Sequence, residues 1–271
     1  MKVLYLDDNS KFDSQGLVIA LGFFDGFHIA HMEILNKTLE LSKSKHLKSA
    51  ILTFTKSITS VINNERFEYL TSIDDKASLA LSLGFDELIL IEPSDTLISM
   101  THAEFFNKYL KDADTLVIGF DYTFGKNRLG NKDYLISQGK NVVSIDEIKL
   151  DNTKVGTYEI KKLLSDGLID DANKMLGRTY SIKGNIYKRN KYYALTKEDY
   201  YLPRSGEYTI KVIGPNISDE INAKIKRLDD ENCIVIKELD DKNIFKSYER
   251  KKPYEIFFTK SSSKSLWLFI L

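Results

Sequence analysis

The 271-residue sequence has little cysteine, little proline and no excess charge of either sign. Its single cysteine, Cys233, excludes an internal disulfide and a thiolate metal cluster, and it fits a reducing compartment. The 39 basic and 39 acidic residues give a formal net charge of zero. The chain therefore lacks the positive electrostatic field by which a general nucleic-acid or anionic-membrane binder attracts its partner. Any binding of phosphate must therefore be local.

Long hydrophobic runs are also missing. Asp7, Asp8 and Asp13 interrupt the start of the chain before a signal-peptide core can form, and the terminal apolar run Leu266–Leu271 is too short to cross a bilayer. Apolar residues still make up 42% of the sequence, which argues against extensive disorder. We therefore expect a folded cytoplasmic protein without a membrane or nucleic-acid partner. The sequence assigns no oligomeric state.

The length favours two domains, because a domain has roughly 150 residues. In the first half, short apolar runs alternate with segments of helical period, which predicts a doubly wound α/β domain with a parallel sheet. These runs are Leu17–Leu21, Ala50–Phe54, Glu87–Ile91, Thr115–Ile118 and Asn141–Ile145. Ligands bind such domains outside the carboxyl ends of the strands. The loops that follow these runs are therefore where a functional site is expected.

After Arg178 the sequence pattern changes to short runs rich in Tyr, Ile and Val, which predicts a small antiparallel β-barrel-like domain. We place the boundary near residue 180, with domains at 1–180 and 181–271. The runs are Tyr180–Tyr187, Glu207–Ile213, Cys233–Ile236, Tyr254–Phe258 and Leu266–Ile270. The Ser/Lys-rich stretch Lys260–Ser265 is read as a solvated hairpin turn.

The strongest motif is Gly22–His31, with the sequence GFFDGFHIAH, between the first predicted strand and the first predicted helix. Glycines there permit a tight turn, and a helix N-terminus offers unpaired N–H groups to a phosphate. His28 and His31 are three residues apart, so both lie on one face of the first turn and can stabilise charge on a triphosphate during transfer. The alternatives are a structural turn in which the histidines only cap the helix, and a zinc pair, for which no third ligand is evident.

The second motif, Gly119–Gly130, follows the fourth predicted strand. Phe120, Tyr122 and Phe124 alternate with polar residues and can form a wall for a flat ring system, while Lys126 and Arg128 can reach a phosphate. The alternative is a set of aromatic core residues followed by a solvated basic loop.

A third segment, Gly156–Gly167, has the pattern of a short helix that stops at Gly167. Thr157 and Lys161 lie in its first turns, where they can contact phosphate. The alternative is that Thr157 is only an N-cap and Lys161 an exposed helix residue.

Together, these motifs resemble the prokaryotic bifunctional riboflavin kinase/FAD synthetase family. The first is similar to that family's G-x-F-D-G-x-H-x-G-H signature, with Ala30 in place of the last Gly, and the second to its G-[FED]-[DN]-F-x-F-G segment. The third resembles S-S-T-x-I-R only loosely, with Tyr158 for Thr and Lys161 for Arg, and lysine loses the planar fork that grips phosphate. Phe54–Ser57 replaces a Pro-His-Pro element, while Thr71 and Lys76 match the family pattern and are read as fold markers.

The resemblance implies an FMN adenylyltransferase that makes FAD and pyrophosphate from FMN and ATP with Mg²⁺, for which the sequence assigns no ligands. By resemblance, the catalytic residues are His28, His31 and Lys161. The nucleotide-binding residues implied are Gly22, Phe23, Phe24, Asp25, Gly26, Ala30 and Thr157. The flavin-binding residues implied are Asp121, Tyr122, Phe124 and Arg128.

The second domain resembles the family's riboflavin kinase barrel only through scattered turns, in Gly184–Tyr187 and Leu202–Tyr208. The family's G-x-P-T-x-N element for Mg-ATP is absent, since the prolines are Pro93, Pro203, Pro215 and Pro253. Glu238 and Glu255 are available as bases, but neither has a recognisable context. We therefore expect that the kinase activity is lost. A bifunctional enzyme with a rearranged kinase site and a non-catalytic flavin or nucleotide sensor remain the alternatives.

Overall fold

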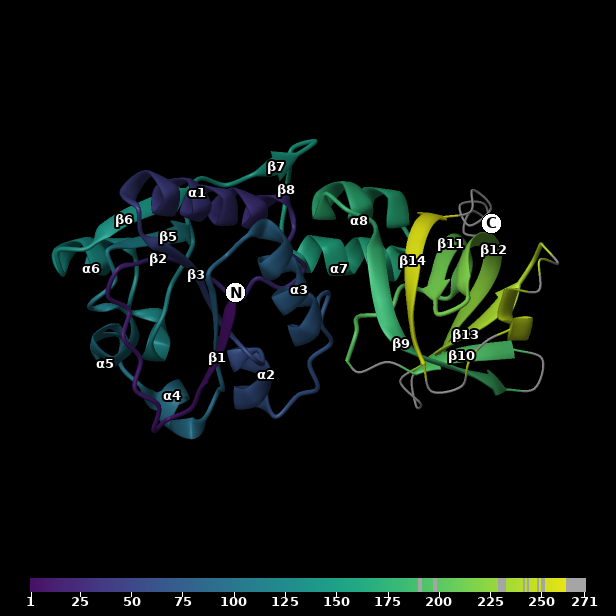
Figure 1. Cartoon of the computed structure of the whole chain (residues 1–271), viewed down its shortest axis with the longest axis horizontal. Coiled ribbons are helices and arrows are strands. Elements are labelled where there is room, and N and C mark those ends of the chain that lie inside the picture. The colour runs from purple at the N-terminus through teal and green to yellow at the C-terminus, as the bar shows by residue number, and fades with distance from the viewer. Residues whose placement is uncertain are drawn as a thin grey trace, which may run out of the picture. The chain divides into compact units, whose positions relative to one another are not determined.

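The computed structural model describes residues 1–189, 192–196, 199–228, 233–240, 242, 244–247, 249 and 252–261. These residues form two compact units (Figure 1). The first unit comprises Met1–Phe67 and Thr71–Lys154, and the second comprises Glu68–Leu70 and the chain from Val155 onward. Within the described residues, no helix combines the length and apolar character that crossing a membrane requires.

The first unit is built on a six-stranded parallel sheet in the order β1-β4-β3-β2-β5-β6. The five predicted runs correspond to β2 (Leu17–Leu21), β3 (Lys48–Phe54), β4 (Glu87–Ile91), β5 (Thr115–Gly119) and β6 (Asn141–Ile145). A sixth strand, β1 (Lys2–Leu6), was not predicted. Among the described strands it pairs with β4 alone, at the edge of the sheet. Its side chains therefore stay largely exposed, with Tyr5 at 65%, and its pattern of buried residues is weak.

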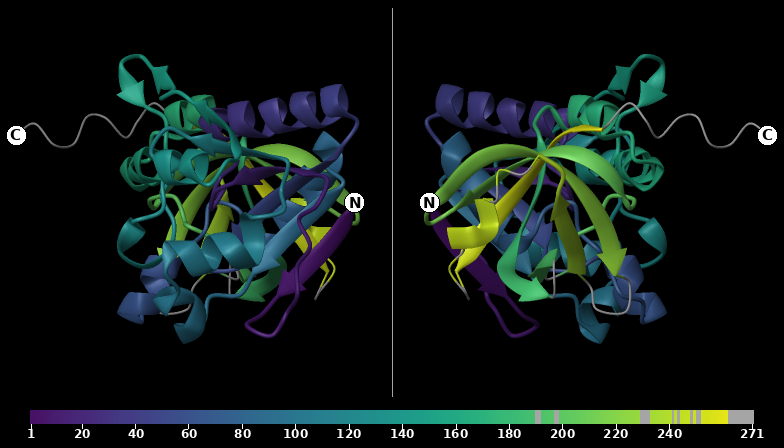
Figure 2. Two further views of the ribbon diagram at one scale, coloured as in Figure 1. Left: turned by 90° about the vertical axis from the view of Figure 1, so that its left-hand side faces the viewer. Right: turned by 90° about the vertical axis from the view of Figure 1, so that its right-hand side faces the viewer.

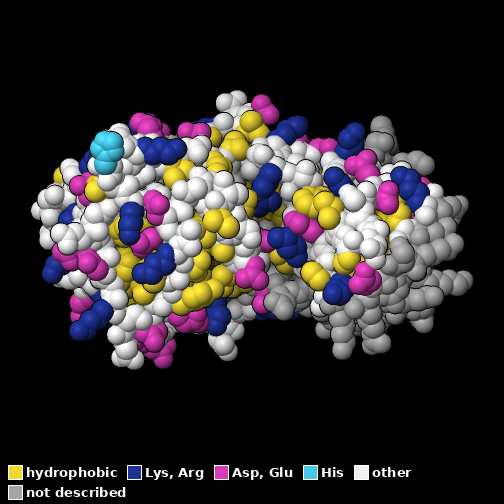
Figure 3. Space-filling view, viewed as in Figure 1, with side chains coloured by type: hydrophobic (Ala, Val, Ile, Leu, Met, Phe, Trp, Pro, Cys, Tyr) yellow, Lys and Arg dark blue, Asp and Glu magenta, His cyan; other side chains and the backbone are white. Residues whose placement is uncertain are grey.

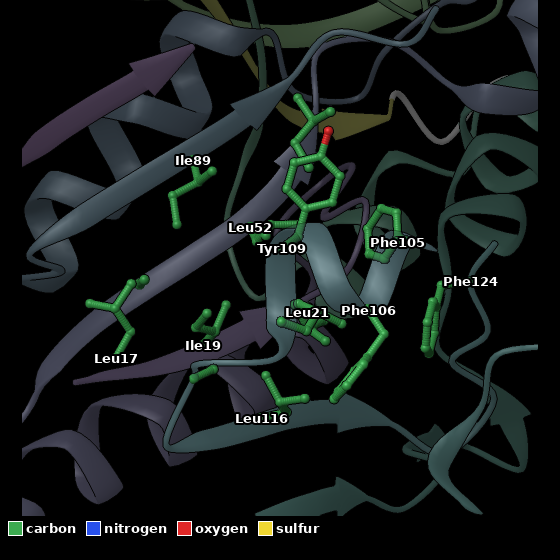
Figure 4. Packing of buried hydrophobic residues seen from close by; sticks show 14 of the residues in the cluster. Leu17, Ile19, Leu21, Leu52, Ile89, Phe105, Phe106, Tyr109, Leu116 and Phe124 are labelled. Atoms are coloured by element: carbon green, nitrogen blue, oxygen red, sulfur yellow. The ribbon is translucent and has the colours of Figure 1, made fainter. Parts of the chain in front are cut away.

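Both faces of this sheet are covered, which confirms the predicted doubly wound architecture. Along β2, Val18 and Ala20 join one core cluster with residues of helices α1 and α3, whereas Ile19 and Leu21 join another (Figure 4). Figure 4 shows the second cluster, where Phe105, Phe106 and Tyr109 pack over the sheet. The helices are α1 (Ile29–Lys45), α2 (Ile58–Asn63), α3 (Ile73–Leu83), α4 (Asp95–Ser99), α5 (His102–Phe105), the π-helical η1 (Phe106–Leu110), the 3-10 turn η2 (Lys126–Arg128) and α6 (Lys132–Ser137).

The strand order reverses beside β2. From β2 the chain runs to β3 and β4 on one side, then crosses to β5 and β6 on the other. The crevice at the carboxyl ends of such strands is where open α/β sheets bind ligands. The loop after β2 and the loop after β5, which carry the two strongest motifs, therefore both start at this reversal point.

The second unit contains a closed antiparallel barrel in the order β10-β13-β12-β11-β14-β9, which confirms the predicted barrel-like fold (Figure 2). Its strands are β9 (Tyr180–Arg189), β10 (Tyr192–Thr196), β11 (Gly206–Gly214), β12 (Ile217–Leu228), β13 (Cys233–Glu238) and β14 (Pro253–Ser261), with a 3-10 turn η4 (Ile244–Ser247). The predicted strand Leu266–Ile270 lies outside the described residues, as does most of the predicted turn Lys260–Ser265.

Two helices precede the barrel, α7 (Thr157–Asp166) and α8 (Ile169–Leu176). Gly167 ends α7 with a φ of 78°, as predicted for a left-handed helix stop. The compact units divide after Lys154, whereas the sequence pattern changes near residue 180, and that boundary between functional domains stays a prediction. The reason is packing: Asn173 on α8 donates to the Phe258 carbonyl of β14 at 2.9 Å, so these helices belong with the barrel. A short hairpin, β7 (Lys149–Leu150) and β8 (Thr153–Lys154), ends the first unit.

Charges of both signs are intermixed on the coloured part of the face drawn in Figure 3. This distribution agrees with the zero formal net charge of the sequence. No large area of one sign covers the described residues on this face. On this face, electrostatic recognition depends on local groups of charge.

Candidate functional site

The loop from Gly22 to His28 makes a sharp turn between β2 and α1. Phe24, Gly26 and Phe27 have φ values of 50°, 96° and 46°, in the left-handed region that non-glycine residues rarely adopt. A Cβ at Gly22 would lie 2.9 Å from the Phe24 ring, so this position requires glycine. Phe24 and Phe27 are nonetheless buried in the core. The loop is therefore held rigidly from beneath, although its backbone is unusual.

His28 and His31 lie together at the N-terminus of α1. Their rings stack with centroids 3.5 Å apart and an interplanar angle of 17°. His28 is the N-cap of α1, and its Nδ1 accepts a hydrogen bond from the His31 backbone N–H at 3.2 Å. In a neutral ring whose Nδ1 accepts, the proton lies on Nε2. His28 thus caps the helix and still has a donor for a ligand.

Burial keeps this histidine pair neutral. It lowers the pKa of His28 to about 4, and the pKa of His31 well below its usual value of 6.5. Neighbouring positive charge acts in the same direction, from Lys154 on His28 and from Lys76 on His31. Nδ1 of His31 is buried and has no hydrogen-bond partner among the described residues. A neutral pair with an unused buried polar atom is suited to donating hydrogen bonds to a ligand without being charged itself.

Asp25 and Phe23 are anchored by residues from other parts of the first unit. The Asp25 side chain is buried, and its Oδ1 accepts from the Thr71 backbone N–H at 3.1 Å. The Phe23 carbonyl accepts from Lys76 Nζ at 2.7 Å and from Thr53 Oγ1 at 2.8 Å. The sequence pattern marked Thr71 and Lys76 only as fold markers and did not single out Thr53. Their contacts with the loop depend on long-range packing, for which the sequence carries no local signal.

The three aromatic residues of the Gly119–Gly130 segment lie in different environments, from the buried core to the surface. Phe124 is buried, packs against Phe105 at 5.5 Å between ring centroids, and is bonded to Gly130 by paired backbone hydrogen bonds of 2.9 and 3.0 Å. Tyr122 stacks on Phe124 with centroids 5.9 Å apart, and Phe120 is 46% exposed. Phe124 is thus a core residue that supports the loop, whereas Phe120 and Tyr122 remain nearer the surface.

The charged residues of this segment pair locally. Asp121 Oδ2 lies 2.9 Å from Lys154 Nζ, and the same ammonium lies 4.9 Å from the centroid of the Phe120 ring. Arg128 donates from Nε to Thr123 Oγ1 at 2.8 Å and is exposed. The sequence carries no signal for Lys154, which lies outside all three motifs. The Asp121–Lys154 pair is half-exposed and stabilises the fold by at most about 1 kcal/mol.

Thr157 and Lys161 lie on α7 in the second unit. Gly156, not Thr157, is the N-cap of α7, so the capping alternative for Thr157 is wrong. Lys161 is half-buried rather than an exposed helix residue. Its Nζ donates to the Glu68 carbonyl at 2.6 Å and lies 5.4 Å from the Tyr201 ring centroid. The structure therefore gathers the predicted residues into three groups: the Gly22–His31 loop, the Gly119–Gly130 segment and the start of α7.

The two candidate kinase bases make structural hydrogen bonds. Glu255 accepts from the Ser181 hydroxyl at 2.7 Å, and Glu238 accepts from the Phe245 backbone N–H at 3.2 Å. The stretch Lys188–Tyr201, which separates the two family-like turns Gly184–Tyr187 and Leu202–Tyr208, lies partly outside the described residues. Across the described part of the chain, no group of three or more His, Cys, Asp and Glu side chains could hold a metal ion.

Comparison with known proteins connects these groups to a family. Residues 10–159 match the FAD synthetase family, which is more than half of the chain. A bifunctional riboflavin kinase/FMN adenylyltransferase from Listeria monocytogenes is 28% identical over 230 residues, covering 78% of this chain and 73% of that protein. An FAD synthetase from the same organism is 29% identical over 203 residues, covering 72% and 81%.

A solved structure shares the fold of nearly the whole chain. The crystal structure of a Streptococcus pneumoniae protein, described as a macrolide-efflux protein, matches with a TM-score of 0.82 over 97% of this chain and 91% of that one. Its sequence identity is 22%, so this likeness concerns the fold alone. The family match covers both motif-bearing loops of the first unit, and it agrees with the resemblance seen in the sequence. This chain belongs to the FAD synthetase family.

Proposed function

We propose that this chain is an FMN adenylyltransferase that transfers AMP from ATP to FMN and releases pyrophosphate. The observation that carries the proposal is the stacked and neutral histidine pair at the N-terminus of α1, with His28 buried and His31 half-buried, directly after the central strand β2. The chain's membership of the FAD synthetase family supports this reaction.

In the proposed reaction, a phosphate oxygen of FMN attacks the α-phosphorus of ATP. The bond from the α-phosphorus to the oxygen that bridges to the β-phosphorus breaks, and pyrophosphate leaves with that electron pair. Backbone N–H groups at the start of α1 receive the phosphates, as helix N-termini do for anions. Imidazole N–H groups of His28 and His31 donate to the oxygens on which charge builds. No side-chain nucleophile is needed.

The remaining loop residues have supporting roles in this proposal. Gly22, Phe24, Asp25 and Gly26 shape the nucleotide-binding turn, and the small Ala30 leaves room beside the adenosine. Asp121, Tyr122 and Arg128 bind the flavin, with Phe124 beneath them as a support. Thr157 and Lys161, on α7 of the second unit, stay predicted phosphate contacts on the basis of the family resemblance. For Lys161 this contact competes with its hydrogen bond to the Glu68 carbonyl.

Mg²⁺ is proposed to arrive with ATP as part of the substrate. Mg²⁺ commonly binds through substrate phosphates, waters and one or two carboxylates rather than in an all-protein cage. The described residues fit that mode better than a dedicated site, since they contain no cluster of three ligands. We assign no protein ligand to the metal.

We further propose that riboflavin kinase activity is lost from the second domain. The missing Pro-Thr-x-Asn sequence and the structural hydrogen bonds of Glu238 and Glu255 support this. The functional boundary near residue 180, a cytoplasmic location and the lack of nucleic-acid partners stay predictions from sequence and composition.

Paired assays test both parts of the proposal. Purified full-length protein is incubated with ATP and Mg²⁺ together with either FMN or riboflavin, and FAD, FMN and pyrophosphate are quantified by chromatography. We expect equal amounts of FAD and pyrophosphate from FMN, and no FMN from riboflavin. Absence of FAD refutes the transferase, and FMN made from riboflavin refutes the loss of the kinase.

The double variant Ala30→Gly/Lys161→Arg separates an enzyme from a sensor. An enzyme changes its turnover only modestly when the family's residues are restored. A sensor that lost activity through these two substitutions gains turnover from near zero. The matched control is each single variant under the same conditions.

A further inference from the structure

One buried lysine lies beneath the nucleotide-binding loop and has no role in the function proposed above. Lys76 on α3 is only 1% exposed. Its Nζ donates to the Phe23 carbonyl at 2.7 Å and lies 4.2 Å from the centroid of the Phe23 ring. A buried ammonium is costly unless it is paired or hydrogen-bonded. The hydrogen bond to the Phe23 carbonyl offsets part of this cost.

The contact of Lys76 fixes a single peptide group. The Phe23 carbonyl also accepts from Thr53 Oγ1 on β3, at 2.8 Å. Two donors from two separate elements thus hold one oxygen, and this oxygen belongs to the peptide that joins Phe23 to Phe24. Phe24 has the left-handed φ of 50°, and its ring packs edge-on against His31 with centroids 5.2 Å apart. The peptide held by Lys76 is therefore directly coupled to the histidine pair.

We infer that Lys76 is a positioning residue for ATP: it fixes the Phe23–Phe24 peptide, so that the turn keeps its phosphate-binding shape, and it adds one positive charge beneath the loop. This inference rests on the proposed function. Lys76 acts through the loop and is not placed in contact with the reacting atoms.

The electrostatic surroundings of Lys76 make its charge sensitive to pH. Burial lowers the pKa of Lys76 to about 8, and the charge of Asp25 acts in the opposite direction. On α1, His31 has its pKa lowered further by Lys76. On α3 itself, Asp74 and Asp75 precede the lysine, and Asp75 accepts from the Ser72 hydroxyl at 2.8 Å within the capping box.

Deprotonation therefore separates the two contributions of Lys76. A neutral amine still has N–H groups and keeps its hydrogen bond to the Phe23 carbonyl, but it no longer attracts phosphate. The affinity for ATP should consequently fall as pH rises through about 8, whereas the loop shape should persist. FMN binding, which we assign to the Gly119–Gly130 segment, should not follow this titration.

The test is the kinetics of Lys76→Met, with ATP and FMN varied separately between pH 6.5 and 9.5. We expect the KM for ATP to rise about 10-fold, the scale of losing one hydrogen bond from a charged donor. The KM for FMN should be unchanged. The wild-type kcat/KM for ATP should fall near pH 8, and Lys76→Met should lack this fall.

Lys108→Met is the matched control. Lys108 Nζ also donates to a backbone carbonyl, that of Asp8 at 2.8 Å, and also lies over an aromatic ring, 5.2 Å from the Tyr109 centroid. Its carbonyl partner is outside the loop. We expect wild-type KM values and the wild-type pH profile, so a general effect of removing a lysine would be detected.

Thr53→Val keeps the inference testable if Lys76→Met does not fold. It removes the second donor to the Phe23 carbonyl and leaves the charge in place. The KM for ATP should rise by roughly 3-fold, the scale of one neutral hydrogen bond, and the fall near pH 8 should remain. A wild-type KM for ATP in the folded Lys76→Met, or in Thr53→Val where Lys76→Met is unfolded, overturns the inference.

Failure of the proposed function gives a different result. In that case the wild-type protein makes no FAD from FMN and ATP. ATP binding measured by calorimetry then replaces KM in the same comparison of wild type, Lys76→Met and Lys108→Met. Equal ATP affinities of the three proteins would overturn the inference independently of any turnover.

Discussion

His28 combines two roles that substitution can separate. Its Nδ1 caps α1, and its Nε2–H is the proposed donor to the transferred phosphate. His28→Ala removes both, whereas His28→Asn retains an N-cap acceptor and removes only the imidazole. Both variants lose the packing of a ring that stacks on His31. The difference in stability between the two variants therefore measures the contribution of the N-cap. The loss of activity that they share measures the contribution of the imidazole.

The magnitudes follow from these contacts. An N-cap side chain stabilises a helix by about 1 kcal/mol, so His28→Asn should be more stable than His28→Ala by that amount, or by roughly 2–4 °C in Tm. Removing one preorganised donor to a developing charge costs about 100-fold or more in kcat, so both variants should lose transfer to that extent. His31→Ala should lose a similar factor.

The assays are thermal unfolding and FAD formation by the full-length protein. His46→Asn serves as the control, because His46 caps the other end of the same helix with φ of 55°, a conformation that asparagine tolerates well. We expect that control to keep both wild-type turnover and wild-type Tm. Wild-type turnover in His28→Asn refutes the catalytic role, and equal Tm values for His28→Asn and His28→Ala refute the capping role.

The same structure supports further predictions. The pKa of His28 falls from 6.5 to about 4 on folding, so the unfolded state binds more protons between these two pH values. The unfolding free energy, measured by urea denaturation, should therefore drop by roughly 3 kcal/mol as pH falls through this window. His28→Asn should lack this part of the drop. Gly22→Ala should lower stability by roughly 1–3 kcal/mol, because its Cβ would lie 2.9 Å from the Phe24 ring; Gly119→Ala, whose Cβ would have its nearest neighbours at 3.6 Å, should unfold at nearly the wild-type temperature. Lys161→Met should lower the unfolding free energy by roughly 1 kcal/mol, since its ammonium bonds a carbonyl; an unchanged urea midpoint would contradict this.

The parts of the site that are contiguous in sequence were the parts that could be predicted. Gly22–His31 contains its own strand end, turn and helix start, so periodicity and turn chemistry suffice to place both histidines on the first turn of α1. The buried central strands were equally clear, because both faces of each are covered and the apolar run is continuous. Edge strand β1 lacks that signal, since only Leu6 of its five residues is buried.

The contacts that decide what each charged residue does were not predictable. The contact of Lys161 with phosphate stays a prediction, whereas the hydrogen bond of its ammonium to the carbonyl of Glu68, a residue 93 positions earlier, had no signal in the sequence. Asp121 pairs with Lys154, 33 positions away, and Lys76 bonds Phe23 across 53 positions. Such pairs form only when the fold brings two segments together, and one sequence has no local pattern that encodes them. A motif predicts which residue types occur in a loop, whereas the partners of those residues depend on tertiary packing.

In the second unit the predicted fold is present, whereas the family's nucleotide-binding motif is absent from the sequence. Its closed barrel is complete in strand order although the Pro-Thr-x-Asn element is missing. The barrel depends on alternating inward residues, such as Tyr208, Ile210 and Val212 on β11, all buried, and not on a ligand-binding loop. The core therefore stays intact when a nucleotide-binding sequence is lost. Since fold alone does not imply function, the barrel cannot serve as evidence for kinase activity, and only the riboflavin assay decides it.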